Sequence, residues 1–214
     1  MIAAVLFSGG QDSSLSSLIL SNYFDVELLT FSAGLSQNWE TAKGVAAKLG
    51  LPHKTVFFDD GVIDAAAKIM IDDGFPNNGL NYLHKKALEC VASMDRYDIL
   101  ADGTRRDDRS PRLDYSEVKS LEDRYNIVYV RPLAGFGRKV IDVLVNRFFV
   151  IREEEDISCR SDYEYEVRMF ISDRYGKDTV DKIFPKRHLH SLVVDKNWSE
   201  KYDEEDKGCE DKTS

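Results

Sequence analysis

Residues 2–6 (IAAVL) run directly into residues 7–14 (FSGGQDSS), so an apolar segment ends in a turn with two glycines, an aspartate and three serines. A short apolar run that stops at glycines is typical of a buried strand. Asp12 or Ser13 can cap a following helix, because apolar residues recur at helical spacing just beyond them, at Leu15, Leu18 and Ile19. The sequence therefore predicts a strand, a glycine turn and a helix as its first three elements.

The pattern that follows alternates β-rich runs with helical runs. Strands are expected at residues 26–31, 54–58, 99–101, 127–130 and 189–194. Helices are expected at residues 40–49, 62–73, 80–95, 138–149, 162–175 and 178–184. This order predicts an α/β fold with a doubly wound, mostly parallel sheet. Such sheets bind ligands beyond the carboxyl ends of their strands, which here means the loops at 8–14, 31–39, 102–114 and 131–139.

The chain divides into three expected segments. We expect a main domain over residues 1–150, a small helical extension packed on it over residues 151–198, and an acidic disordered tail over residues 199–214. The tail carries seven acidic and three basic residues and so supplies −4 of the net charge of −9. Its apolar surface is too small to offset the entropy cost of ordering it.

Composition limits the class of protein. The 214 residues are 43% hydrophobic, and no apolar run approaches the roughly 20 residues that span a bilayer. The first residues lack the basic segment of a signal peptide. The cysteines, Cys90, Cys159 and Cys209, form no CxxC pair, which argues against a disulfide framework or a zinc ribbon. We therefore expect a cytoplasmic protein with free thiols and no membrane partner.

The opening turn has the chemistry of a phosphate site. Gly9 and Gly10 let the backbone approach a ligand closely, and the N–H groups at a helix start attract anions. Ser8, Ser13 and Ser14 add hydroxyl donors. Asp12 would repel a phosphate unless a divalent cation lay between them. The turn is neither a GxxxxGK[ST] loop nor a GxGxxG turn. The residues therefore predict a phosphate together with Mg²⁺.

The run Ser8-Gly9-Gly10-Gln11-Asp12-Ser13 resembles the SGGxDS signature of the PP-loop, or N-type ATP pyrophosphatase, superfamily. The resemblance covers about residues 1–150, and the chain looks most like small stand-alone archaeal-type PP-loop proteins. It implies a Rossmann-like architecture with ATP and Mg²⁺ as cofactors. It also implies cleavage of ATP to AMP and pyrophosphate, in which a substrate oxygen attacks the α-phosphorus and becomes adenylated.

The same resemblance implies further site residues. All six residues from Ser8 to Ser13 would bind the nucleotide, with Phe31 and Ser32 near the adenine. The segment DGTRRDDRSPRLD at residues 102–114 would bring Gly103 and Thr104 to the nucleotide. Asp107 or Asp108 would hold Mg²⁺ or position the substrate.

Charged side chains complete the expected catalytic set, which is Asp12, Asp107, Asp108 and Lys139, with Asp12 and Asp108 as the metal ligands. Residues 131–133 (RPL) resemble a late motif of tRNA-modifying members of the superfamily, and Arg138 and Lys139 follow a glycine turn. Either basic side chain could neutralise the α-phosphate during transfer. Both could equally do no more than open a helix.

The sequence leaves the second chemical step open. Cys90 has the pattern of a core residue, whereas Cys159 is the better candidate for a sulfur carrier, although its acidic neighbours oppose a reactive thiolate. Cys209, in the acidic tail, raises a different and distant option, reduction of an adenylylated sulfate, because the related PAPS reductases carry a reactive cysteine on a C-terminal tail. His188 and His190 could share one face of a strand, but two ligands make no closed zinc site.

Several functions remain open at this point. The leading interpretation is an adenylating enzyme acting on a nucleobase, with tRNA as a candidate partner and sulfur transfer as the second step. Arg105, Arg106, Arg109 and Arg112 could contact a few phosphates. The alternatives are an ammonia- or amine-dependent ligase for a small molecule and a non-catalytic ATP-binding regulatory module. A homodimer, or a partner protein that supplies sulfur or RNA binding, would complete either enzyme.

Overall fold

The main sheet of the computed structural model, which describes residues 1–59, 61–154, 161–185 and 190–197, has five parallel strands. They are β1 (Ile2–Leu6), β2 (Asp25–Ser32), β3 (His53–Phe57), β4 (Ile99–Ala101) and β5 (Val128–Val130). Their order is β3-β2-β1-β4-β5, and each neighbouring pair is parallel. The predicted doubly wound α/β sheet is therefore confirmed. Strand order reverses between β1 and β4, which is where such sheets bind ligands.

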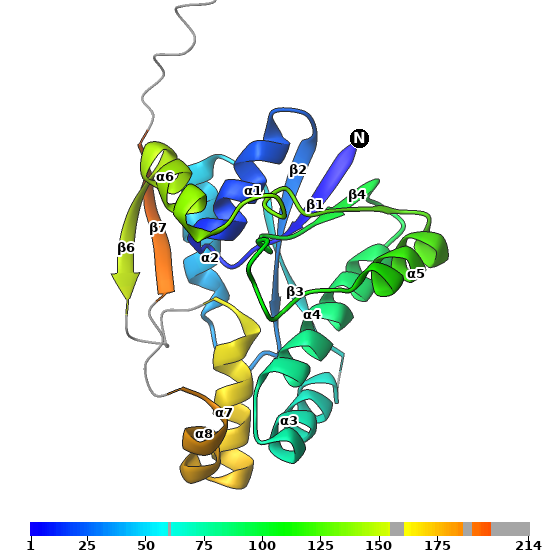
Figure 1. Cartoon of the computed structure of the whole chain (residues 1–214), viewed down its shortest axis with the longest axis vertical. Helices are drawn as coiled ribbons and strands as arrows, with labels where there is room; N and C mark the ends of the chain where they lie inside the picture. Colours follow the sequence, from blue (N-terminus) through cyan, green and yellow to red (C-terminus); the bar gives the residue numbers. More distant parts are fainter. Residues whose placement is uncertain (60, 155–160, 186–189, 198–214) are drawn as a thin grey trace, which may run out of the picture.

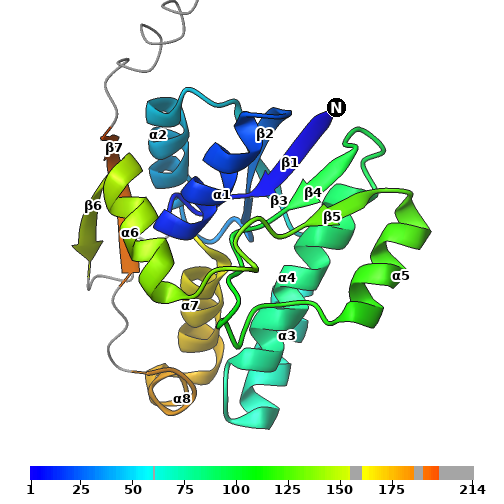
Figure 2. The same ribbon diagram turned by 45° about the horizontal axis from the view of Figure 1, so that its top comes forward.

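Helices cover both faces of this sheet (Figures 1 and 2). One face packs against α1 (Gln11–Ser21), α2 (Trp39–Leu49) and α6 (Arg138–Phe148). The other packs against α4 (Asn77–Ala92) and α5 (Tyr115–Tyr125). The strands β1, β2 and β4 supply buried residues to both cores, as strands covered on two faces must.

A third core joins the C-terminal part to the rest of the chain. It forms where α3 (Val62–Asp73) and α4 meet α7 (Tyr163–Tyr175) and α8 (Lys177–Ile183). Beside it, β6 (Phe149–Glu154) and β7 (His190–Lys196) pair antiparallel as a separate two-stranded ribbon. The extension that was expected to be helical therefore also contains a β-ribbon, and the expected boundary at residue 150 falls inside β6.

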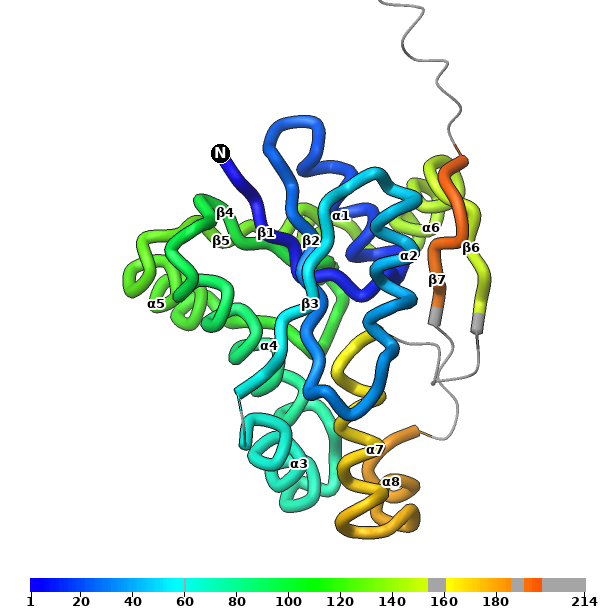
Figure 3. The backbone as a smooth tube through the Cα atoms, turned by 180° about the vertical axis from the view of Figure 1, so that it is seen from behind, coloured from blue at the N-terminus to red at the C-terminus, as the bar shows by residue number. Residues whose placement is uncertain are grey.

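The ribbon packs against the opening turn rather than extending the main sheet (Figure 3). The Val193 amide donates to the Gly9 carbonyl at 3.2 Å, and Gly10 forms an isolated bridge with Leu192. Leu192 and Val193 also join the core beneath α1 and α2. The last described strand thus fixes the first glycine turn in place.

Two elements were not predicted. Helix α5 has a single buried residue, Leu121, so its apolar pattern is weak. Its start is nevertheless encoded, because Asp114 and Glu117 form a reciprocal capping box. A helix was expected over residues 138–149, and no strand was expected after it. In the structure α6 ends at Phe148, and β6 begins at the next residue.

Other expectations fall on particular residues. Cys90 is half-buried against the core of the α4 and α5 face, as predicted, and burial raises the pKa of its thiol. Cys159, His188, Cys209 and the acidic tail lie outside the described residues. No helix in the described part of the chain combines the length and the apolar character needed to cross a bilayer.

Candidate active site

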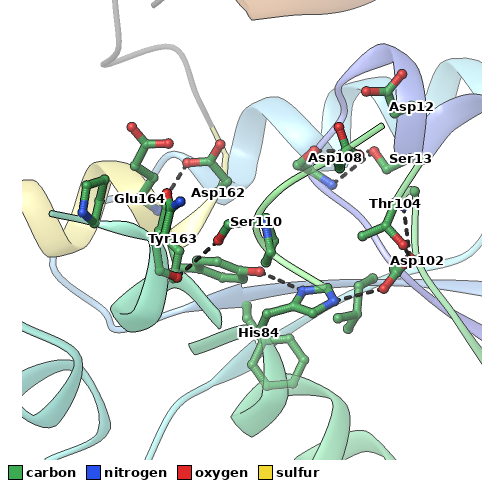
Figure 4. Close-up of a pocket in the computed structure, with 18 of the residues that line it drawn as sticks. Asp12, Ser13, His84, Asp102, Thr104, Asp108, Ser110, Asp162, Tyr163 and Glu164 are labelled. Carbon is green, nitrogen blue, oxygen red and sulfur yellow. Dashed lines mark hydrogen bonds and ion pairs between the residues drawn. The ribbon is translucent and has the colours of Figure 1, made fainter. Parts of the chain in front are cut away.

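A cavity of about 780 Å³ opens at the carboxyl ends of β1 and β4, where the strand order reverses. Its volume lies in the usual range for small-molecule sites. The walls come from the opening turn, the segment after β4, the start of α4, and helices α7 and α8. Figure 4 shows Asp12, Ser13 and Asp108 at one end and Tyr163 at the other, with His84 between them.

The opening turn has the geometry that its glycines predicted. Gly9 has a φ of 73°, a left-handed conformation that other residues adopt at a cost. A side chain there would also meet Ala42 and Val45 of α2 at 3.2 to 3.3 Å. The hydroxyls of Ser8 and Ser13 lie 3.3 Å apart, and Ser13 donates to the Gly10 carbonyl at 3.2 Å. The turn therefore presents ordered hydroxyls and the N-terminus of α1 to the cavity.

Asp12 is the unsatisfied group of this site. Its Oδ1 atom is buried without a hydrogen-bond partner, and Oδ2 lies 3.6 Å from Arg105 Nε. Burial raises the pKa of Asp12 to about 6, against the lowering effect of the Arg105 charge. A nearby cation would favour the ionised form of such a carboxylate, because it would offset part of the cost of burying the charge.

Arg105 is held among three acidic side chains. Its Nη2 donates to Asp108 Oδ1 at 2.6 Å, and its Nε lies within 4.0 Å of Asp107. Its Nη1 is buried without a partner. Asp107 accepts from the Arg138 amide at 3.1 Å and so caps the start of α6. Asp108 therefore faces the cavity with its charge already paired, whereas Asp107 serves the neighbouring helix.

The centre of the cavity is a fully satisfied carboxylate. Asp102, which is 2% exposed, accepts hydrogen bonds from His84 Nε2 at 2.8 Å and from Tyr129 at its Oδ2. The Thr104 amide and hydroxyl donate to its Oδ1 at 2.9 and 2.7 Å. Burial alone would raise the pKa of Asp102, but these bonds outweigh it and hold the pKa below its usual value. These donors therefore favour the ionised form of Asp102.

His84 extends this network to the C-terminal part of the chain. Its Nδ1 lies 2.8 Å from the Tyr163 hydroxyl, and the side chain is only 4% exposed. The sequence analysis missed both residues, because they belong to no motif and stand 79 positions apart. Burial raises the pKa of Tyr163 well above that of a free phenol, so it stays neutral.

A second buried carboxylate organises the loop after β2. Glu166 of α7 accepts from the backbone amides of Ala33, Leu35 and Ser36 at 2.5 to 3.1 Å, and from the Ser32 hydroxyl at 2.9 Å. The loop that was expected to receive adenine is thus held from the C-terminal side of the molecule. Ser32 is engaged with Glu166, whereas Phe31 lines the cavity.

The structure brings many of the predicted site residues to one cavity. Those that line it are Ser8, Asp12, Ser13, Phe31, Gly103, Thr104 and Asp108. Those that do not are Gly9, Gly10, Gln11, Ser32, Asp107 and Lys139. Gly103 has a further role, since a side chain there would lie 2.7 Å from the Ser13 amide nitrogen. Lys139 is exposed in the first turn of α6.

The arginines after β4 do not act as one patch. Arg105 is largely buried in its ion pairs, whereas Arg106, Arg109 and Arg112 are exposed. Among the residues that the structure describes, no three His, Cys, Asp or Glu side chains are arranged to hold a metal ion by themselves. Any Mg²⁺ here would need ligand phosphates to complete its coordination, which is its usual habit.

Sequence comparison assigns the chain to a family. Residues 1–195 match the profile described as a family of unknown function, DUF7411. The chain belongs to that family. A Methanocaldococcus jannaschii relative, described as uncharacterized protein MJ0690, is 42% identical over 192 residues, which cover 89% of this chain and 94% of the relative.

A solved structure shares the arrangement. The crystal structure of a predicted subunit of tRNA methyltransferase from M. jannaschii has a TM-score of 0.85 and 40% identity, over 93% of this chain and 99% of that one. The U34-tRNA thiolase NcsA from Methanococcus maripaludis has a TM-score of 0.49 and 15% identity, over 84% of this chain and 69% of that one. The second likeness is too low to carry an argument.

Proposed function

We propose that the chain is a PP-loop enzyme that binds Mg·ATP and cleaves it to AMP and pyrophosphate while activating a substrate oxygen. One observation carries this proposal. The SGGQDS turn lies at the reversal of strand order, at the N-terminus of α1, with an unpartnered Asp12 oxygen beside the cavity. A turn built only to join a strand to a helix has no need of a buried, unpaired carboxylate.

The residues present fit Mg²⁺. The free Oδ1 of Asp12 supplies one carboxylate ligand, and Asp108 supplies a second once Arg105 releases it. Mg²⁺ normally uses one or two carboxylates together with substrate phosphates. Bound there, it would neutralise phosphate charge as the substrate oxygen approaches.

The chain's own groups have distinct roles in this proposal. Ser8, Ser13 and the first amides of α1 bind the pyrophosphate end of ATP. Arg105, whose Nη1 has no partner, moves from Asp108 to the phosphates and stabilises the charge that develops on them. Lys139 is a proposed second cation for the α-phosphate, supplied from the start of α6.

The decisive experiment uses ATP labelled at the α-phosphate, with Mg²⁺ and a mixture of metabolites and tRNA. The proposal expects labelled AMP and unlabelled pyrophosphate, and Asp12→Asn should reduce the rate at least tenfold. Labelled ADP would identify a different class of ATPase. Tight ATP binding without any cleavage would favour the regulatory module.

We further propose that the activated substrate is part of a tRNA. One observation favours it, because the M. jannaschii structure that covers 93% of this chain is described as a predicted subunit of tRNA methyltransferase. Arg106, Arg109 and Arg112, exposed beside the cavity, could contact backbone phosphates.

We expect tRNA binding at low salt that weakens in Arg106→Ala with Arg109→Ala, while Arg124→Ala on α5 serves as the control. Absence of binding above that of an acidic control protein would favour the small-molecule ligase. Binding only after a second protein is added would show that the RNA contacts come from a partner.

A further inference from the structure

The loop after β2, residues 32–36, is held by a residue from the C-terminal part of the chain. Glu166 of α7 is 3% exposed and lies beside the carboxyl end of β2 (Figure 3). Its two oxygens accept hydrogen bonds from the amides of Ala33, Leu35 and Ser36 and from the hydroxyls of Ser32 and Ser36. One side chain, 130 to 134 positions away along the sequence, therefore sets the course of this loop.

The loop depends on Glu166 more than the fold does. Gly34 and Leu35 are exposed, so amides that lost Glu166 could turn to water. The Ser32 hydroxyl accepts from the Gly34 amide at 2.9 Å and donates to Glu166, which links the turn to the same carboxylate. Strand β2 itself keeps its ladder bonds to β1 and β3. Without Glu166 we expect the loop to lose its single shape while the sheet persists.

This loop continues one wall of the cavity. Phe31, the residue just before it, lines the cavity together with Leu6, Phe7 and Leu29 of the neighbouring strand ends. The same cavity is lined by Ser8, which follows Phe7 directly in the opening turn. A nucleotide with its phosphates at the start of α1 can lay its base on this apolar wall, because a base offers flat apolar faces.

Helix α7 supports the wall as well as the loop. The ring centroids of Phe31 and Phe58 lie 5.0 Å apart, and those of Phe58 and Tyr163 lie 6.1 Å apart, both within the range of aromatic pairs. The Phe58 amide also donates to the Ser32 carbonyl at 3.0 Å. Tyr163 and Glu166 are three positions apart on α7 and so share one side of the helix. The same side of α7 therefore backs the wall and grips the loop beyond it.

We propose that Glu166 is a positioning residue for the nucleoside end of the bound nucleotide. Glu166 does not line the cavity, so it acts through residues 32–36 and keeps the wall at Phe31 in the shape that receives base and ribose. Part of the affinity for the nucleotide then comes from the C-terminal part of the chain. This inference rests on the proposed function and adds a residue that the SGGQDS turn does not contain.

The test compares two probes by calorimetric titration, Mg·pyrophosphate and the Mg²⁺ complex of α,β-methylene-ATP, which cannot be cleaved to AMP. Both share the phosphate end, and only the second has a nucleoside. Glu166→Ala should weaken binding of the ATP analogue about tenfold, because the loop amides lose their acceptors. Binding of pyrophosphate should change less than about twofold, because its partners are in the opening turn. A loss of folded protein would weaken both probes alike, so the ratio of the two dissociation constants reports the loop.

Glu27 provides a matched control near the amino end of the same strand. It is a buried carboxylate, 7% exposed, that accepts from Tyr97 and pairs with Lys54 and Arg96 at 3.0 and 3.1 Å. Glu27→Ala should lower the free energy of unfolding and leave the ratio of dissociation constants unchanged. If the ratio shifts as far as in Glu166→Ala, any buried carboxylate of β2 or its surroundings has the same effect and the proposal fails.

A milder variant decides the matter where Glu166→Ala does not fold. Glu166→Gln keeps the packing and one acceptor oxygen, but its amide nitrogen cannot accept from the loop N–H groups. We expect a smaller shift of the ratio in the same direction. An unchanged ratio in every Glu166 variant that folds would overturn the proposal.

The outcomes separate this inference from the proposed function. A wild type that binds both probes, with a ratio that no Glu166 variant changes, would refute the role of Glu166 and leave the enzyme intact. A wild type with the Glu166-dependent ratio that never forms AMP from ATP would keep the role of Glu166 and refute the enzyme. A wild type that binds neither probe would overturn both.

Discussion

Two aspartates stand just beyond the ends of neighbouring strands, and their environments are opposite. Asp12, in the first turn of α1, has one buried oxygen with no partner, and its pKa is raised to about 6. Asp102, directly after β4, accepts four hydrogen bonds, and its pKa is lowered.

This difference in hydrogen-bond donors indicates that Asp12 is suited to bind a ligand, whereas Asp102 stabilises the protein. Asp12 is destabilised in the free protein, and a cation would relieve it. Asp102 is stabilised by the protein itself and orders His84, Tyr129 and Thr104. The same residue type, near the carboxyl ends of two neighbouring strands, thus has two uses, which the surrounding hydrogen-bond donors decide.

The largest expected effect on stability comes from replacing Asp102, the aspartate whose oxygens all have hydrogen-bond donors. Asp102→Asn should lower the free energy of unfolding by about 3 to 5 kcal/mol, because it removes a buried charge from its donors. Because the folded pKa of Asp102 is lowered, its contribution is present above the unfolded pKa of about 4 and is lost on acidification below it. Urea unfolding between pH 3 and 7 measures both effects. A pH-independent loss would mean that Asp102 does not titrate as described.

A smaller effect on stability is expected at Gly103, which follows Asp102 and packs against the backbone of Asp12 and Ser13. Gly103→Ala places a carbon 2.7 Å from the Ser13 amide nitrogen and 2.8 Å from the Asp12 carbonyl carbon. Because these are backbone atoms, we expect a loss of about 2 kcal/mol together with weaker Mg·ATP binding. The control is Gly44→Ala, where α2 leaves open space and about 0.5 to 1 kcal/mol of stabilisation is expected. If both variants melt alike, the close packing of Gly103 carries no weight.

Replacing Asp12, the aspartate with an unpartnered oxygen, should raise the free energy of unfolding and not lower it. The folded pKa of Asp12 is about 6, whereas an unperturbed aspartate has a pKa of 3.8, so its stability contribution is fully present below pH 4 and is lost as pH rises through 6. Asp12→Asn should therefore gain about 1 to 2 kcal/mol on the wild type between pH 4 and 7, after allowance for partial exposure. Urea unfolding at both pH values checks this. Added Mg·ATP should reverse the order, since only the wild type binds it tightly.

The smallest expected effect on stability concerns Lys139. Because the side chain is exposed, Lys139→Ala should change the free energy of unfolding by less than about 0.5 kcal/mol. ATP cleavage should fall severalfold, and by less than in Arg105→Ala, because Arg105 is already at the cavity. Lys119→Ala on α5 is the control. Unchanged cleavage would remove Lys139 from the proposed site.

The sequence predicted the site residues of the opening turn and of the segment after β4, but not those that come from α4 and α7. Ser8 to Ser13 are contiguous, so one motif placed them, and the alternation of strands and helices placed the segment after β4 beside them. His84, Tyr163 and Glu166 come from α4 and α7, and no short spacing links them. Each is a common residue in an ordinary helix until the fold brings it to the cavity.

The missed elements have local causes. Helix α5 buries only Leu121, so its apolar pattern was weak, although the capping box at Asp114 and Glu117 was a usable signal. Among the described strands, β6 pairs only with β7, from which it is separated by two helices. Its existence depends on a partner far along the chain, which no local pattern contains.

The attachment of β7 to Gly9 and Gly10 sets an order of events during synthesis. Gly9 leaves the ribosome well before Val193, whose amide donates to the Gly9 carbonyl. At ordinary elongation rates the two are separated by a delay on the order of ten seconds or more. A growing chain therefore carries the complete phosphate motif long before that motif is braced. We expect the nucleotide to bind tightly only to the completely folded chain, and therefore not to assist the early stages of folding.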